Sequence, residues 1–513
     1  MLDSRKMNNR YQDTVLRLIR EAGERMKKTI QKQLIRRSII AVLVIAGIVL
    51  VGLEKKATFA TETKEAADDQ QSMETEKLYL TESSEETSNT NVDISVIEEA
   101  VYSDNDIPDS YEFEKPLSDT DTFKLFEDKS KEISAVINDK DKRTVTITNR
   151  ESTLLDDLAN VCMQSYISKE MPDLNRLYDL SNSMRQENRL LTEVYFYEKA
   201  LVKANKVASF DYSVDIADVK PLSDNVDEII FYLRKSLHTD EGDEDGGTWF
   251  IIRAAASSEG YKILDLWAQD YEYEMIQNRM KTDYIEKNIP LDRERLQKET
   301  KERIEEAMKE AETKAPFDDE SEPSDKAANE ENPTRRTTIS YDRTAVGAAA
   351  KKYAKNYNPL FVAQDLDCTN YVSQCMWQSP GWPFDRIGNS SAVKWSCKKN
   401  SAGKYTYETY SWISVNDLWT YFQKNDSPSQ AGTVYGISAT TSGYNSSNAQ
   451  VGDVIQFHNG SMWRHSVIVS EIVNGQRRCA AHTDDYAARP LSEYLAIYSN
   501  YRVAHINNFI TSY

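Results

Sequence analysis

Residues 367–381 carry the pattern of a short helix that begins at a cysteine. Five side chains at spacings of three and four residues would share one buried face of this helix: Cys368, Tyr371, Val372, Cys375 and Met376. Asp367 is of a residue type that caps helix N-termini, and Pro380-Gly381 would end the helix. The pattern therefore predicts that Cys368 is the first residue of a buried helix.

A thiol at the first turn of a helix is poised to become a thiolate. The unpaired amides and the helix dipole favour negative charge there, and reactive cysteines have pKa values of roughly 3.5–7.5 instead of about 8.5. The same amides can bind an oxyanion. The carboxylates of Asp365 and Asp367 oppose the thiolate unless capping engages them. Cys368 is therefore a candidate nucleophile.

A β-hairpin further along the chain offers the proton acceptor that such a thiol needs. Residues 451–457 read as a strand, Asn459-Gly460 is a strong turn signal, and residues 463–469 read as the return strand. His465 shares one face of that strand with Val467 and Val469, so it should point into the core. His465 is the candidate base, and His458, beside the turn, is the alternative.

A third polar group could orient the imidazole of His465. Residues 479–484 read as the neighbouring strand, and they offer His482 or Asp484 for this role. The sequence leaves both alternatives open. If Cys368 and His465 form a thiolate–imidazolium pair, Cys368 should react well below the pKa of a free thiol.

These residues resemble the putative amidase domain family, which is related to the NlpC-type and CHAP (cysteine-histidine amidohydrolase/peptidase) cell-wall hydrolases. The resemblance covers residues 341–513 and rests on these matches: Tyr341/Arg343, Tyr357-Asn358-Pro359, 367–374 (Asp-Cys-Thr-Asn-Tyr-Val-Ser-Gln), Ser411-Trp412, Gly452-Asp453, His465-Ser466 and His482-Thr483. It implies a papain-like cysteine amidase or peptidase, with Cys368 as nucleophile, His465 as base and then acid, and His482 as the third residue. We expect no cofactor and no metal. The segment Pro380-Gly381-Trp382 departs from the Gly-Gly of the family.

An uncharged apolar run at residues 38–53 predicts a membrane segment. As a helix it would be about 24 Å long, slightly short of a hydrocarbon core of about 30 Å. Residues 1–37 contain eleven Lys or Arg and four Asp or Glu, so the positive-inside rule places this leader in the cytoplasm and the body outside. We expect a single-pass anchor. Cleavage after Thr58-Phe59-Ala60, which would release a secreted protein, is the alternative.

The rest of the chain predicts two further parts, and the fold class is α+β. Residues 54–145 read as an acidic, disordered tether, because residues 61–120 hold eighteen Asp or Glu and three Lys. Residues 150–285 read as an accessory domain with helices at 154–170 and 174–201, followed by strands at 207–219, 229–237, 248–256 and 261–267. The acidic, glycine-rich residues 243–247 read as a turn. Residues 286–340 read as a solvated helix and a linker.

Charge and cysteine content narrow the function. A net charge of −20 argues against a nucleic-acid partner. The five cysteines form no C-x-x-C pair, and we expect no disulfide between Cys397 and Cys479. The sequence favours an extracytoplasmic amidohydrolase that acts on peptides or on peptidoglycan stem peptides. A catalytically silent wall-binding protein and a structural surface protein are the alternatives.

Overall fold

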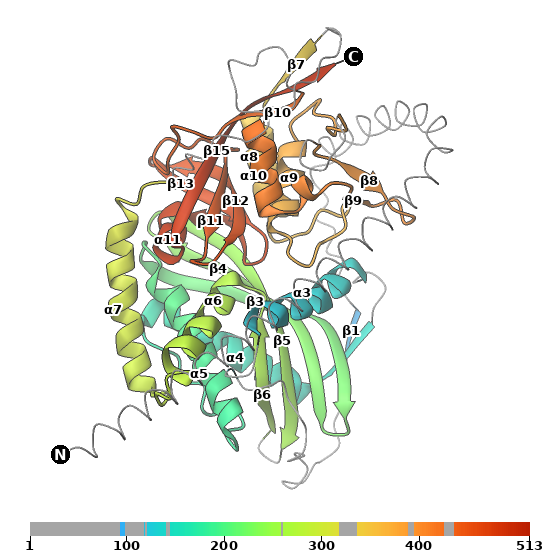
Figure 1. The fold of residues 1–513 in the computed structure, drawn as a ribbon. Coiled ribbons are helices and arrows are strands. Elements are labelled where there is room, and N and C mark those ends of the chain that lie inside the picture. The colour runs from blue at the N-terminus through green and yellow to red at the C-terminus, as the bar shows by residue number, and fades with distance from the viewer. Residues whose placement is uncertain are drawn as a thin grey trace, which may run out of the picture. The chain divides into compact units, whose positions relative to one another are not determined.

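One continuous β-sheet runs through the two halves of the protein (Figure 1). The computed structural model describes residues 93–97, 117, 121–139, 144–257, 260–317, 336–387, 394–424 and 435–512, all within one compact unit, Glu86–Tyr513. The mixture of helices and sheet confirms the α+β class. The papain-like assignment stays a prediction.

The first half is an antiparallel meander with helices packed against it. Its elements are β1 (Asp93–Ile97), α3 (Thr122–Asp139), β2 (Thr144–Thr148), α4 (Asn149–Ser168), α5 (Ser183–Leu201), β3 (Val207–Ser223), β4 (Val226–Thr239), β5 (Gly242–Ser257), β6 (Gly260–Ala268), α6 (Tyr271–Met280) and the π-helix η4 (Lys281–Ile285). The four predicted strands of the meander are present. The second predicted helix starts later than expected, because Asn182 caps it by accepting a hydrogen bond from the Arg185 amide.

Helix α3 lies within the range that the sequence assigns to the disordered tether. Phe126, Ile133, Val136 and Ile137 recur at helical spacing along it and are buried. The tether is predicted from the acidic composition of the whole range, and composition alone does not detect this apolar helix face. The structured body therefore extends further towards the N-terminus than the sequence predicts.

The described residues of the second half form the helix that begins at Cys368, three further α-helices and a set of mainly antiparallel strands. Its elements are β7 (Arg336–Ser340), α8 (Arg343–Tyr353), α9 (Cys368–Trp377), β8 (Cys397–Lys399), β9 (Tyr405–Tyr407), the 3-10 helix η6 (Tyr410–Trp412), α10 (Val415–Lys424), β10 (Gly436–Thr440), β11 (Val454–His458), β12 (Trp463–Val473), β13 (Gln476–Ala481), β14 (Asp485–Pro490), α11 (Leu491–Ile497) and β15 (Asn500–Ser512). Strands β11 and β12 form the predicted hairpin, with Phe457 opposite His465. Strand β7 pairs with β15, so the end of the predicted linker is part of the sheet.

Strand β14 joins the sheet of the second half to the sheet of the first. The strand order is β10-β15-β11-β12-β13-β14-β5-β4-β3, with β6 paired to β5 and β7 to β15. At the junction, Asp485 and Tyr486 pair with Gly247 and Gly246 of β5. A Cβ atom on Gly247 would lie 2.2 Å from the ring of Tyr232, so this close approach requires glycine. The predicted turn at residues 243–247 is therefore wrong: these residues continue β5 to the junction.

Helix α7 (Arg293–Ala311) packs along both halves, contacting α5 and α11 (Figure 1). The sequence predicts it as a solvated helix because it is rich in Glu and Lys. Leu296, Thr300, Ile304 and Ala311 nevertheless form a buried stripe. The helix is therefore solvated on one side only.

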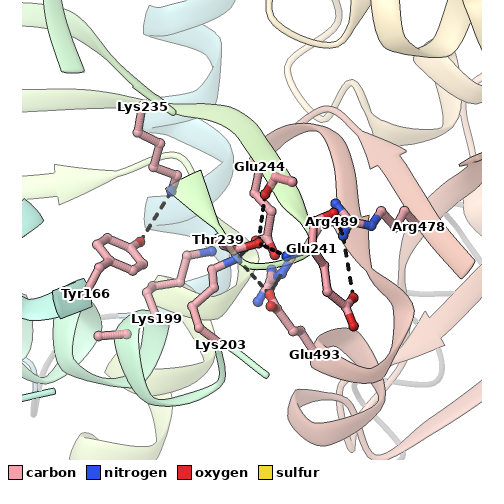
Figure 2. Close-up of polar contacts among 12 residues, drawn as sticks. Tyr166, Lys199, Lys203, Lys235, Thr239, Glu241, Glu244, Arg478, Arg489 and Glu493 are labelled. Carbon is pink, nitrogen blue, oxygen red and sulfur yellow. Dashed lines mark hydrogen bonds and ion pairs between the residues drawn. The ribbon is translucent and has the colours of Figure 1, made fainter. Parts of the chain in front are cut away.

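A buried network of charged groups fills the junction between the halves (Figure 2). Lys203, which follows α5, lies 2.7 Å from Glu244 of β5 and 2.8 Å from Glu493 of α11. Lys199 lies 2.9 Å from Asp270 and 2.5 Å from Asp484. The pairs of Lys203 with Glu493 and of Lys199 with Asp484 cross from one half to the other, so the two halves form a single folded unit.

Several sequence predictions fall on residues outside those that the structure describes. These are the leader at 1–37, the apolar run at 38–53, most of the tether at 54–145 and the linker at 318–335. Within the described residues, no helix is both long and apolar enough to span a bilayer.

Candidate functional site

Cys368 is the first residue of α9, as predicted, and its side chain is buried. Asp367 occupies the N-cap position, as predicted, but its side chain makes no cap hydrogen bond. Its carboxylate instead accepts hydrogen bonds from the Gln364 amide at 2.6 Å and the Asn370 side chain at 2.7 Å, and it contacts His482 at 2.5 Å. The Asp367 charge is therefore engaged away from the first amides of α9.

A cleft of about 490 Å³ opens beside Cys368, and both halves of the chain line it. The first half contributes Glu127 and Lys131 from α3 and Tyr271 from α6. The second half contributes Cys368 and, with other residues, Arg464 of β12. A substrate that reached the thiol would therefore contact both halves.

His465 lies on β12, the strand that packs against α9. A hydrogen bond of 3.0 Å from the Thr369 hydroxyl to the Ser466 hydroxyl joins the residue after Cys368 to the residue after His465. The helix and the strand are thus held together at the level of the two candidate catalytic residues.

Three tyrosine rings surround the imidazole of His465. The ring centroids of Tyr271, Tyr494 and Tyr498 lie 5.0, 5.9 and 6.0 Å from it. Its Nδ1 atom is buried and has no hydrogen-bond partner among the described residues. Within the part of the chain that the structure describes, aromatic packing therefore orients this imidazole, and neither His482 nor Asp484 hydrogen-bonds to it.

The surroundings of His465 keep its imidazole neutral. Burial lowers its pKa to about 3; the nearby Asp484 carboxylate opposes this shift, and the cations of Arg489 and Lys199 add to it. The thiolate–imidazolium pair considered from the sequence is therefore not favoured with the site arranged in this way. A neutral imidazole is, however, the form that can accept a proton from a thiol.

His482 contacts the residue that precedes Cys368 and makes no hydrogen bond with His465. Its Nδ1 lies 2.5 Å from Asp367 and its Nε2 2.8 Å from the Tyr353 carbonyl oxygen. The rings of Tyr357 and Tyr371 pack on its two faces at 4.1 and 4.0 Å. Burial lowers the pKa of His482, but the Asp367 hydrogen bond and nearby carboxylates outweigh burial and raise it overall. His482 thus holds the residue that precedes Cys368.

Asp484 belongs to the buried network of charges at the junction. Its carboxylate comes close to those of Asp270 and Glu272, an arrangement of acidic groups that could in principle hold a metal ion. The ammonium group of Lys199 lies 2.9, 3.3 and 2.5 Å from Asp270, Glu272 and Asp484. Lys199 therefore already supplies the positive charge that these carboxylates need.

The remaining histidines have other partners. His458, the alternative base, is at the hairpin tip and contacts the Ser499 hydroxyl. His505 lies 2.9 Å from Asp453. His238 is paired with two carboxylates at the far end of β4, from Asp211 and Asp243. All five cysteines of the chain are buried and free.

Tyr271 is the site residue that the sequence reasoning missed. Its hydroxyl lies 3.5 Å from the Cys368 sulfur. Ninety-seven positions separate the two residues, and no local pattern relates them. The available signal was modest: a tyrosine directly after Asp270, a good N-cap residue, at the start of a helix that follows a strand.

Comparison with known proteins gives a match over the segment that contains the candidate site. No curated protein and no solved structure gives a significant match to this chain. A family model described as "putative amidase domain" matches residues 340–506, which include Cys368, His465 and His482. Residues 340–506 are therefore similar to the putative amidase domain family, a description that suggests hydrolysis of amides.

Proposed function

We propose that the protein is a cysteine-dependent amidohydrolase, with Cys368 as nucleophile and His465 as general base. The observation that carries the proposal is the position of Cys368, which begins α9, lines the cleft and lies on the helix that is hydrogen-bonded to the His465 strand. An amidase-family match over the same residues supports amide hydrolysis.

In the proposed mechanism, the neutral imidazole of His465 takes the proton of the Cys368 thiol as the sulfur attacks the amide carbon. The carbonyl oxygen becomes an oxyanion, which the free amides at the start of α9 can stabilise. The carbon–nitrogen bond then breaks, and the leaving amine takes the proton from His465. Water, deprotonated by His465, hydrolyses the thioester and releases Cys368.

We further propose that the substrate is a peptide or a peptidoglycan stem peptide outside the cytoplasm. The cleft contains carboxylate and cationic side chains from Glu127, Lys131 and Asp365, which suits a polar, charged peptide chain. The basic leader and the apolar run at residues 38–53 support a membrane-anchored or secreted body. Phosphatase and β-galactosidase reporters fused after Glu85 would test this location, since only the phosphatase should be active. The reverse result would refute it.

The decisive experiment is a digest of purified peptidoglycan with the full chain, with the products identified by mass spectrometry. Cys368→Ala should abolish product formation. Cys375→Ala is the matched control, because Cys375 is on the same helix and burial raises the pKa of its thiol well above the ordinary value. Undiminished hydrolysis by Cys368→Ala would show that this thiol is not the nucleophile.

A catalytically silent binding protein is the second candidate. The observation that favours it is the imidazole of His465, whose Nδ1 has no partner among the described residues. Wild-type protein that binds peptidoglycan without releasing any product would support this alternative over hydrolysis.

A further inference from the structure

Helix α6 of the first half reaches into the site of the second. Its first residue, Tyr271, enters the site, and Asp270 caps the helix just before it. Glu274, one turn further on, forms two hydrogen bonds of 3.0 and 3.1 Å with the guanidinium of Arg464. Because Arg464 directly precedes His465, this buried ion pair fixes the start of α6 against the strand that carries the candidate base.

Tyr271 is the side chain that contacts both candidate catalytic residues. Its hydroxyl is 3.5 Å from the Cys368 sulfur, and its ring is 5.0 Å from the imidazole of His465. The ring also stacks on Phe126 of α3 at 5.3 Å, and the Arg464 guanidinium lies 4.8 Å from its centroid. Tyr271 is 1% exposed, so packing on several sides holds the hydroxyl at the sulfur.

We propose that Tyr271 is a catalytic residue supplied from outside the amidase domain, whose hydroxyl donates a hydrogen bond to the Cys368 sulfur and stabilises the thiolate. This proposal rests on the proposed function, because it assigns a role in the same reaction. It also gives the first half of the chain a chemical part in catalysis beyond that of an accessory module.

The environment of the site explains why such a donor is needed. When the thiol ionises, the bond between sulfur and hydrogen breaks, and His465 takes the proton. The resulting thiolate is buried, and a buried anion requires hydrogen-bond donors. Besides Tyr271, the hydrogen-bonding group that the structure places at this sulfur is the Thr369 hydroxyl, at 3.8 Å. That hydroxyl donates to Ser466 instead.

Tyr271 is suited to remain a donor throughout the reaction. Burial raises the pKa of its hydroxyl far above the ordinary value, and the neighbouring Cys368 raises it further. The phenol therefore keeps its own proton at the pH values where a thiol ionises. Its role is to stabilise the charge on sulfur, while the proton itself moves to His465.

The test is the pH dependence of iodoacetamide labelling of Cys368, followed on the peptide that contains it by mass spectrometry. Tyr271→Phe keeps the ring that packs on His465 and removes only the hydroxyl. A hydrogen bond to a charged group is strong enough that its loss should raise the apparent pKa of labelling by about one to two pH units. Hydrolysis at neutral pH should fall by roughly tenfold or more in parallel.

Tyr273→Phe is the matched control. Tyr273 is also buried on α6, but its hydroxyl donates to the Leu266 carbonyl oxygen within the first half. Thermal melting of both variants would show whether each is folded. The control should label with the wild-type pH dependence.

The outcomes separate this proposal from the proposed function. An unchanged labelling curve in folded Tyr271→Phe, with hydrolysis lost in His465→Ala, would overturn the role of Tyr271 and leave the cysteine mechanism standing. Faster labelling in Tyr271→Phe would also overturn it, because the residue would then be a gate over the thiol. Full hydrolysis by Cys368→Ala would instead overturn the proposed function itself.

Discussion

Removing the Lys203 ammonium group should destabilise the whole folded unit. Its Nζ lies 2.7 Å from Glu244 and 2.8 Å from Glu493, and all three side chains are 0% exposed. Removing one partner of a buried ion pair typically costs about 3–5 kcal/mol. Glu493 retains Arg489 at 2.9 Å, whereas among the described residues the side chain of Glu244 accepts its hydrogen bond from Lys203. We therefore expect Lys203→Met to lower the free energy of unfolding by about 3 kcal/mol, near the lower limit of that range.

Thermal melting at neutral pH would measure this effect. For a unit of this size, about 3 kcal/mol corresponds to a fall in Tm of roughly 3 °C. Lys351→Met is the matched control: Lys351 pairs with Glu471 at 3.0 Å, but their side chains are 47% and 27% exposed. A pair as exposed as this contributes about 0–1 kcal/mol. Equal melting of wild type and Lys203→Met would refute the idea that the junction network holds the halves together.

The pH dependence gives the same prediction an independent check. Burial raises the pKa of Glu244, but the cations of Lys203, Arg478 and Arg489 together outweigh burial, and the net pKa is lowered. In the wild type, this carboxylate therefore contributes stability above its unfolded-state pKa, which is lost as the pH falls through the folded-state pKa. Without Lys203 the folded-state pKa of Glu244 should rise. Lowering the pH should then protonate this carboxylate and remove its unpaired charge. The difference in Tm between wild type and Lys203→Met should shrink between pH 7 and pH 5.

Two further perturbations test how the site is built. His482→Asn should lower the free energy of unfolding by about 2 kcal/mol, because it removes a buried hydrogen bond to Asp367. Denaturant titration would measure this change. If His482→Asn altered the labelling of Cys368 more than His465→Ala does, His482 would have a direct role in catalysis. Residues 336–513 expressed alone should not melt cooperatively, because Arg464 and Asp484 lose buried partners in the first half; a soluble fragment with a sharp thermal transition would contradict this.

Local patterns in the sequence were sufficient for the elements that carry the catalytic residues. The apolar spacing after Cys368 predicted α9, and Asn459-Gly460 predicted the β11–β12 hairpin with His465 on its return strand. Each of these signals lies within about fifteen residues of chain, where helix periodicity and turn chemistry act. The four strands of the meander were predictable for the same reason.

What the sequence could not show depends on contacts between distant parts of the chain. The capping role expected for Asp367 fails because His482, 115 positions away, engages its carboxylate. Residues 243–247 have the composition of a turn, yet Gly246 and Gly247 form strand because β14 approaches them closely. Local sequence periodicity cannot predict either contact, because the partner residue lies far away in the sequence.

The charge environment of His465 is also a product of both halves. Lys199 comes from the first half, and Asp484 and Arg489 come from the second. Asp484 is held with a φ of 91°, and Thr483 beside it with a φ of 62°, backbone conformations that are costly for these residue types. The ion pair of Asp484 with Lys199 at 2.5 Å and the hydrogen bond of Thr483 with the Asp367 amide at 3.2 Å help to offset that cost. Contacts from both halves thus hold the loop after β13, and the same assembly sets the low pKa of His465 and brings Tyr271 to the Cys368 sulfur.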